Sequence, residues 1–97
     1  MIYSRIHVHE NDRILAACDE EIIGETFRGG GAKITVSELF YGGELISEEI
    51  FIERTKSVTI MNLVGNRVVG AAVREGLVAE CNVIVIGGVK HAQTVIL

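Results

Sequence analysis

The sequence predicts a compact α+β domain of two layers, with a mixed or antiparallel sheet and two to three helices on one of its faces. Two observations support this fold class. Segments with strand-like patterns lie at both ends of the chain, and segments with helical spacing lie between them. Helices placed in this way bury their apolar side against one face of the sheet. A chain of 97 residues has room for one core, so we expect a single domain, residues 1–97.

Short strands and turns are predicted for the first half of the chain. "YSRIHVHE" alternates polar and apolar residues, and "RILAACD" is an apolar run of strand length, so they predict a hairpin with Asn11 and Asp12 at its tip. Asp19 and the two glutamates after it predict a helix start, although Gly24 leaves room for one turn only. The glycines at 29–31 predict a flexible loop, and "KITVS" predicts a short strand.

Two helices and a hairpin are predicted for the second half. Ser47 is expected to cap "SEEIFIERTKSV", a helix that ends at Gly65, although the β-branched run "SVTI" disfavours its last part. The helix "RVVGAAVREG" is expected between Asn66 as its cap and Gly76 as its end. The residues expected to face inward are Phe51, Val58 and Met61 in the first helix, and Val68, Ala71, Ala72 and Glu75 in the second. "NVIVI", a turn at Gly87 and Gly88, and "AQTVIL" predict the final hairpin.

Composition and charge restrict the function classes. The net charge of −4 excludes a basic surface around the whole molecule, although a local basic patch remains open. No apolar run is long enough to span a membrane, and the first ten residues lack the apolar core of a signal peptide, so we expect a cytoplasmic protein without a membrane partner. Cys18 and Cys81 are then expected to be reduced, buried and unreactive.

Two patterns that could indicate chemistry are incomplete. In "FRGGGAK" no serine or threonine follows Lys33, as a phosphate-binding loop requires, so a plain hairpin loop is favoured. The histidines and cysteines lack the spacing of a zinc site, so neither a metal nor a cofactor is expected. The residues considered for that site are His7, His9, His91, Cys18 and Cys81. Carboxylates beside Cys18 disfavour a catalytic thiolate.

The polar residues of the final strand are the main candidates for a binding site. His91 and Gln93 share one strand face, and they are either ordinary solvated residues, a structural latch or ligand contacts. In "LFYGGEL" we expect a tight turn at positive φ and a buried Phe40. Tyr41 is a candidate exposed stacking surface, although packing of both rings in the core or the turn is favoured. A bulge near Ala92 is expected to turn the polar pair into a cleft while Val95 and Leu97 enter the core. The candidate binding residues are Tyr41, Gly42, Gly43, Lys90, His91 and Gln93.

Four stretches together resemble the archaeal family known as domain of unknown function 424. They are "ACDEEIIGETFR", "VSELFYGG", "IMNLVG" and "VIVIGGVKHAQ", and they span nearly the whole chain. The resemblance implies a small cytoplasmic α+β protein associated with information processing, and it assigns no catalytic residue. The positions that match are Cys18, Asp19, Glu20, Gly24, Phe40, Tyr41, Gly42, Gly43, Asn62, Gly65, Gly87, Gly88, His91, Ala92 and Gln93.

Three functions remain open, and binding is favoured over catalysis. The first is a non-enzymatic protein that binds RNA or a ribonucleoprotein and acts in translation, because single-stranded RNA is recognised by stacking aromatics and a few hydrogen-bonding side chains. The second is a small enzyme or metal-dependent hydrolase that uses Asp19, Glu20 and His91. The third is a protein-interaction subunit with a protein partner. In each case we expect a monomer or a weak dimer.

Overall fold

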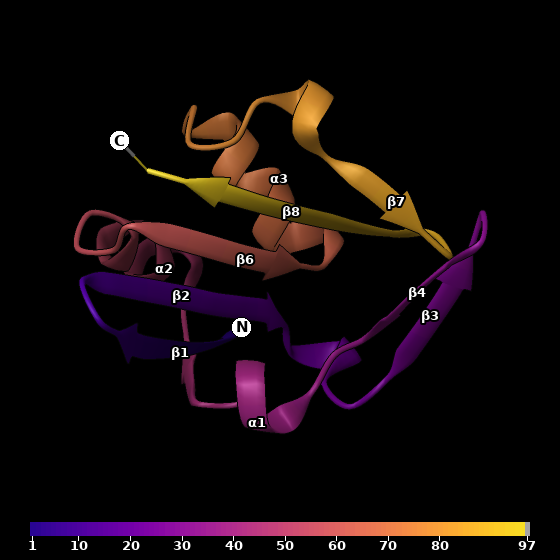
Figure 1. Ribbon diagram of the computed structural model, residues 1–97, viewed down its shortest axis with the longest axis horizontal. Helices are drawn as coiled ribbons and strands as arrows, with labels where there is room; N and C mark the ends of the chain where they lie inside the picture. Colours follow the sequence, from indigo (N-terminus) through magenta and orange to yellow (C-terminus); the bar gives the residue numbers. More distant parts are fainter. Residues whose placement is uncertain (97) are drawn as a thin grey trace.

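Six strands form one mixed sheet in the computed structural model, which describes residues 1–96 (Figure 1). The order across the sheet is β5-β1-β2-β6-β8-β7. β2 and β6 run parallel, and the other neighbours are antiparallel. The strands are β1 (Ile2–His9), β2 (Asp12–Asp19), β5 (Glu44–Ile46), β6 (Ile60–Val64), β7 (Ile84–Ile86) and β8 (Val89–Val95). The predicted α+β class is confirmed, and the first and last hairpins belong to one sheet.

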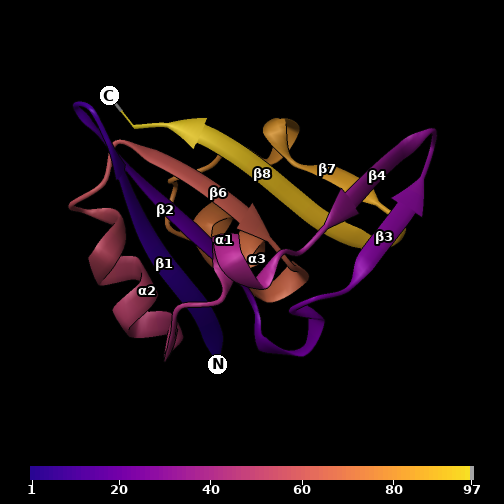
Figure 2. The same ribbon diagram turned by 60° about the horizontal axis from the view of Figure 1, so that its bottom comes forward.

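A second, two-stranded sheet is formed by β3 (Thr26–Gly29) and β4 (Ala32–Thr35), which we call the β3–β4 arm. The arm extends to the end of the main sheet at which β7 turns into β8 (Figures 1 and 2). Its turn is made by Gly30 and Gly31, both at positive φ, so the predicted loose glycine loop is a tight hairpin turn. The turn of the β1–β2 hairpin is Glu10–Asn11, one residue earlier than predicted, because His9 pairs with Asp12.

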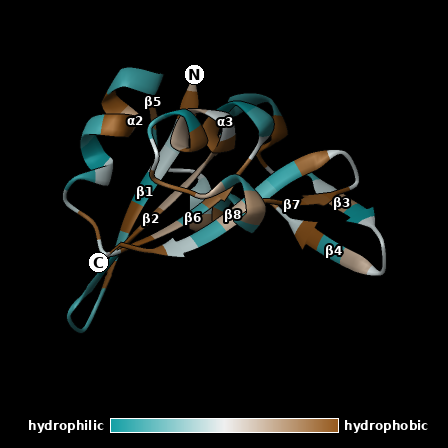
Figure 3. Ribbon diagram, turned by 90° about the horizontal axis from the view of Figure 1, so that it is seen from above, coloured by the Kyte–Doolittle hydropathy of each residue, from teal (hydrophilic) through white to brown (hydrophobic). Residues whose placement is uncertain are grey.

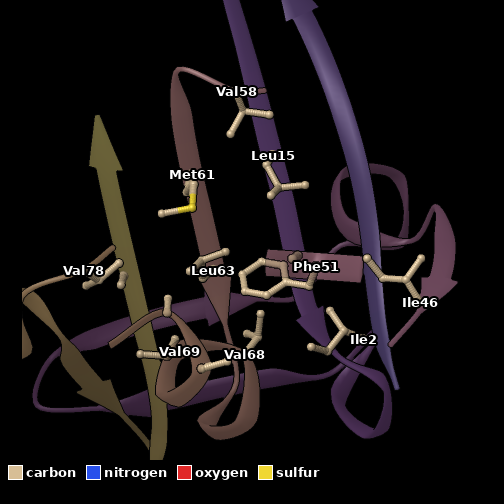
Figure 4. Close-up of a cluster of buried hydrophobic side chains, with 14 residues drawn as sticks. Ile2, Leu15, Ile46, Phe51, Val58, Met61, Leu63, Val68, Val69 and Val78 are labelled. Carbon is tan, nitrogen blue, oxygen red and sulfur yellow. The ribbon is translucent and has the colours of Figure 1, made fainter. Parts of the chain in front are cut away.

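Two helices cover one face of the main sheet. α2 (Glu48–Thr55) and α3 (Asn66–Arg74) lie on the same side of it (Figure 3). Between them and the strands lies the larger core, with Leu15, Met61 and Leu63 from the central strands, Phe51 from α2 and Val68 from α3 (Figure 4). None of the helices within residues 1–96 is long and apolar enough to cross a membrane.

The opposite face of the sheet is covered only in part. A single helical turn, α1 (Glu38–Tyr41), lies over it near β1 and β2, and the β3–β4 arm lies over its other end (Figure 2). A smaller core joins these parts to the sheet, through Tyr41 and Val36 on one side and Cys18, Val64 and Val89 on the other. We call this side of the sheet the open face. Two short 3-10 turns, η1 (Glu20–Ile22) and η2 (Glu80–Asn82), complete the fold.

The main difference from the sequence-based prediction is the strand β6. The segment around Val58 and Met61 was expected to continue the helix to Gly65, but Ile60–Val64 forms a central strand. Met61 and Leu63 face the helices, whereas Val64 packs in the smaller core on the opposite side. Because the strand buries Met61 and Leu63 on the helix side and Val64 on the other side, its apolar residues do not simply alternate with polar ones, and the β-branched run was the better guide.

The two predicted helices are found, with different ends. α2 ends at Thr55 and is capped by Ser47 as expected. Gly76, at positive φ, follows the end of α3 as predicted, but Glu75 is exposed rather than packed. Asn66 does not cap α3, because it is the first helical residue and its side-chain oxygen accepts from the amide of Lys90.

Candidate functional site

The register of the strands arranges the side chains of the open face in rows. Ala16, Asn62 and Gln93 are neighbours across β2, β6 and β8. On one side of this row lie Ile14, Ile60 and Val95. On its other side lie Cys18, Val64, His91 and Ile84. An amide pair is therefore placed within an aliphatic surface.

A hollow of about 390 Å³ opens on this surface. Ile14, Ile60 and Val95 give it an aliphatic floor, and Phe40 forms one aromatic wall. Its side-chain polar groups are the two amides, because Met61 and Thr94 pair with each other and point to the helix side. None of its lining residues is charged. They are Ile14, Phe40, Ile60, Met61, Asn62, Gln93, Thr94 and Val95. We call this the β6–β8 hollow.

Phe40 forms the aromatic wall and is held from two sides. The His7 ring stacks on it, with ring centroids 4.7 Å apart and planes inclined by 12°. The same histidine donates through Nε2 to the carbonyl oxygen of Phe40, 2.8 Å away. The hydroxyl of Ser37 caps the turn by accepting from the amide of Phe40. The ring is thus fixed beside the hollow, and it is only half-buried.

Tyr41 is buried, as the favoured interpretation of its segment had it, so it is not the exposed stacking surface that its place among the candidate binding residues requires. It is 4% exposed, so Phe40 and not Tyr41 offers an aromatic surface. The Tyr41 hydroxyl donates to Oδ1 of Asn62 at 2.6 Å. Burial, together with the nearby Cys18, raises the pKa of Tyr41 to about 12, so the phenol keeps its proton. Because Oδ1 is occupied by the phenol, the NH₂ group of Asn62 is the end of this amide that remains for a ligand.

Gln93 and His91 lie on the open face as predicted from strand alternation. The Gln93 side chain is exposed and lines the hollow. His91 is half-buried, and its Nδ1 donates to the carbonyl oxygen of Leu63 at 2.9 Å, which leaves Nε2 for another partner. His91 lines a second hollow of about 190 Å³, which it shares with Ile84 and Gln93. The two hollows meet at Gln93.

The expected bulge is absent. β8 pairs without interruption with β6 from His91 to Val95 and with β7 from Val89 to His91. Plain alternation therefore places Val95 on the open face, where it is 63% exposed, and not in the core. Leu97 lies outside the described residues. Gly87 and Gly88 do make the predicted turn, at φ of 58° and 83°.

The other predicted binding residues do not line the β6–β8 hollow. Lys90 points to the helix side and lines a separate hollow beside α3. Gly42 accepts from Arg5 at 2.5 Å, and a Cβ on Gly43 would lie 2.4 Å from the carbonyl oxygen of Ser4. Neither glycine has the positive φ that was predicted, since Gly42 has φ −80° and Gly43 is not among the positive-φ glycines. Gly43 allows the close approach of this segment to β1, whereas Gly42 allows close contact with the carbonyl oxygen of Glu38 in α1.

Sequence reasoning did not identify Ile60, Asn62 and Phe40 as site residues. Asn62 was detectable in principle, because it is a polar residue inside the otherwise apolar segment "IMNLV". A half-buried polar side chain in a central strand needs hydrogen-bond partners, and here one partner is Tyr41. The role of Phe40 depends on which side of a single helical turn faces the sheet, and local sequence does not determine that.

The residues of the enzyme alternative each make contacts with other parts of the fold. The carboxylate of Asp19 is buried and accepts from the amides of Arg67 and Val68, both at 2.9 Å, so it caps α3. Glu20 lies 3.8 Å from the amino group of Met1. The His91 ring donates a hydrogen bond to the carbonyl oxygen of Leu63. Within residues 1–96, no three histidine, cysteine, aspartate or glutamate side chains gather as a metal site would require.

The two cysteines differ in environment. Cys18 is buried, and its pKa is raised to about 12, mainly by burial and further by Asp19 and Glu21. Its thiol is therefore protonated and inaccessible, as predicted. Cys81 is free but exposed, so the prediction that it is buried is wrong.

Comparisons with known proteins show that this chain is similar in sequence to one protein family and similar in fold to a solved structure. The family model described as "Protein of unknown function (DUF424)" matches residues 6–97. A solved structure, an uncharacterized conserved protein from Methanopyrus kandleri, superposes with a TM-score of 0.84 at 27% identity, over 99% of this chain and 91% of that one. A search of curated proteins gave no match.

Proposed function

The chain belongs to the family of unknown function DUF424, and, because that description names no activity, we propose from the open face that it binds single-stranded RNA, free or within a ribonucleoprotein, by taking a nucleobase into the β6–β8 hollow. The observation that carries this proposal is the placement of two amides, Asn62 and Gln93, opposite each other beside an aromatic ring and over an aliphatic floor.

The side chains of the β6–β8 hollow are complementary to an unstacked nucleobase. A nucleobase is flat and apolar on its faces, and it carries donors and acceptors on its edge. Single-stranded RNA is recognised by stacking on aromatic side chains and by hydrogen bonds to base edges. Phe40 and the aliphatic floor supply contacts for the faces, and the NH₂ of Asn62 and the amide of Gln93 supply contacts for the edge. The volume lies within the range of small-ligand sites.

The distribution of charge is compatible with RNA despite the net charge of −4. Four carboxylates gather around a hollow that α2 and α3 line on the helix side, namely Glu48, Glu49, Glu53 and Glu75. The lining of the β6–β8 hollow, on the opposite face of the sheet, contains no charged residue. Repulsion between the protein and phosphate is therefore weaker at the β6–β8 hollow than at the acidic hollow on the helix side.

Binding of labelled single-stranded oligonucleotides, measured by fluorescence anisotropy at low salt, tests this function. We expect Phe40→Leu and Gln93→Ala each to weaken the binding of a preferred RNA about fivefold or more, because stacking of one base and paired hydrogen bonds to a base edge each contribute about 1–3 kcal/mol. Leu39→Ala is the control, since Leu39 is 83% exposed on the same helical turn but does not line the hollow. The proposal is wrong if no RNA binds, or if Phe40→Leu and Gln93→Ala bind as the unaltered protein does.

A further inference from the structure

The β3–β4 arm has one apolar side and one basic side. Phe27 and Ile34 pack into the smaller core against the open face. The arm is also held near its turn, because a Cβ on Gly29 would lie 2.7 Å from the amide nitrogen of Gly87 in the β7–β8 turn. Strand alternation then places the remaining side chains on the outer side, namely Thr26, Arg28, Lys33 and Thr35.

Two like charges lie opposite each other on this outer side. Arg28 pairs with Lys33 in the register of the hairpin, and both side chains are exposed. Like charges at directly opposite positions destabilise a hairpin. None of the ion pairs formed within residues 1–96 includes either residue, and residues 26–35 contain no carboxylate. A local positive charge is thus maintained in a chain of net charge −4.

Hydroxyl groups lie next to the two cations. Thr26 Oγ1 and Thr35 Oγ1 are 2.9 Å apart and exposed, two pairs further from the turn than Arg28 and Lys33 and on the same side of the hairpin. Guanidinium, ammonium and hydroxyl groups are the side-chain donors that proteins use to contact phosphate oxygens. The outer side of the arm therefore combines charge and hydrogen-bond donors that suit a phosphodiester backbone.

We propose that Arg28 and Lys33 bind phosphates of the same RNA strand whose base enters the β6–β8 hollow, an inference that rests on the proposed function. The arm adjoins the β7–β8 turn, and β8 leads from this turn to Gln93 (Figures 1 and 2). The path from Gly88 to Gln93 is about 17 Å at ~3.4 Å per residue, which a few nucleotides cover. The hollow selects the base, and the arm supplies affinity that does not depend on sequence.

The salt dependence of RNA binding tests this assignment with Arg28→Gln combined with Lys33→Gln. Each phosphate contact on a single strand contributes about 0.7 to the slope of log K against log salt concentration, so the slope should become shallower by about 1.4. The preference among oligonucleotides of different base should stay unchanged. The melting temperature should stay the same or rise, because the repulsion between the two cations is removed. The control is Lys56→Gln with Arg74→Gln, the same change of charge on the helix side of the molecule.

The outcomes separate this inference from the proposed function. An unchanged slope and affinity in the arm variant, with binding still lost in Phe40→Leu, would overturn the role of the arm and leave the hollow intact. An equal change in the control pair would also overturn it, because the effect would then reflect net charge alone. If the unaltered protein binds no RNA, both proposals fall.

Discussion

Asp19 ends β2, and its buried carboxylate takes the place of a side-chain cap for α3. Gly65, the N-cap residue, has no side chain that could accept hydrogen bonds from the first turn of α3. The two carboxylate oxygens of Asp19 accept them instead, from the amides of Arg67 and Val68. A Cβ on Gly65 would lie 2.4 Å from the Asp19 carboxyl carbon, so the glycine makes room for the carboxylate. The negative charge also lies at the positive end of the helix dipole.

Asp19→Ala should therefore lower the free energy of unfolding by about 2–3 kcal/mol, since two charge-assisted hydrogen bonds are lost and two amides are left unpaired. Urea denaturation measures this loss. Glu21→Ala is the matched control, because its ion pair with Arg67 is exposed and contributes about 0–1 kcal/mol. Equal, small losses in both variants would show that the cap is not important for stability.

At the residue scale, sequence patterns predicted on which face of a strand the polar residues lie. They did not predict the residues that these side chains contact. His91 and Gln93 share the open face because alternation in β8 is regular. Sequence did not determine which of Phe40 and Tyr41 offers an aromatic surface, because adjacent residues on one helical turn point in different directions and only the position of α1 on the sheet decides between them. The contact of Asp19 with α3 is likewise not apparent from the sequence, because the two segments are distant in it.

Among the elements, the β3–β4 arm depends on close backbone contact with the β7–β8 turn. Gly29→Ala places a methyl group against the amide of Gly87 and should cost about 1–3 kcal/mol of stability through overpacking. Gly30→Asn is the control, because Gly30 has φ +57° and open space around it, and asparagine tolerates that conformation. Its effect should stay within about 0.5 kcal/mol.

Urea denaturation compares the stabilities of these two variants, and the amide spectra of residues 26–35 show whether the arm has moved. A Gly29→Ala variant as stable as Gly30→Asn, with unchanged arm resonances, would contradict the contact between the arm and the β7–β8 turn.

At the element scale, segments with local signals were predicted and the central strand was not. The cap at Ser47 and the end at Gly76 are local features, and both are found. The turn at Gly87 and Gly88 is also local, since two consecutive residues at positive φ favour glycine. β6 instead owes its conformation to β2 and β8, one parallel and one antiparallel neighbour, and long-range pairing of this kind leaves little trace in the segment itself.

At the scale of the whole molecule, the sheet separates two surfaces of different character. α2 and α3 cover one face and present carboxylates to solvent. The other face has an uncharged hollow between α1 and the strands β6 and β8. The β3–β4 arm, which carries Arg28 and Lys33, lies at the end of the sheet where β7 turns into β8 (Figure 2). Fold class and strand alternation were accessible from sequence. The hollow was not, because its residues come from four separate elements.

The central claim is that the open face binds single-stranded RNA, and a titration of isotope-labelled protein with a short oligonucleotide tests it most directly by NMR. We predict saturable shifts of the side-chain NH₂ groups of Asn62 and Gln93 and of the backbone amides of β6 and β8, with resonances of α2 and α3 unchanged. Shifts confined to α2 and α3, or no shift at any RNA concentration, would contradict the claim.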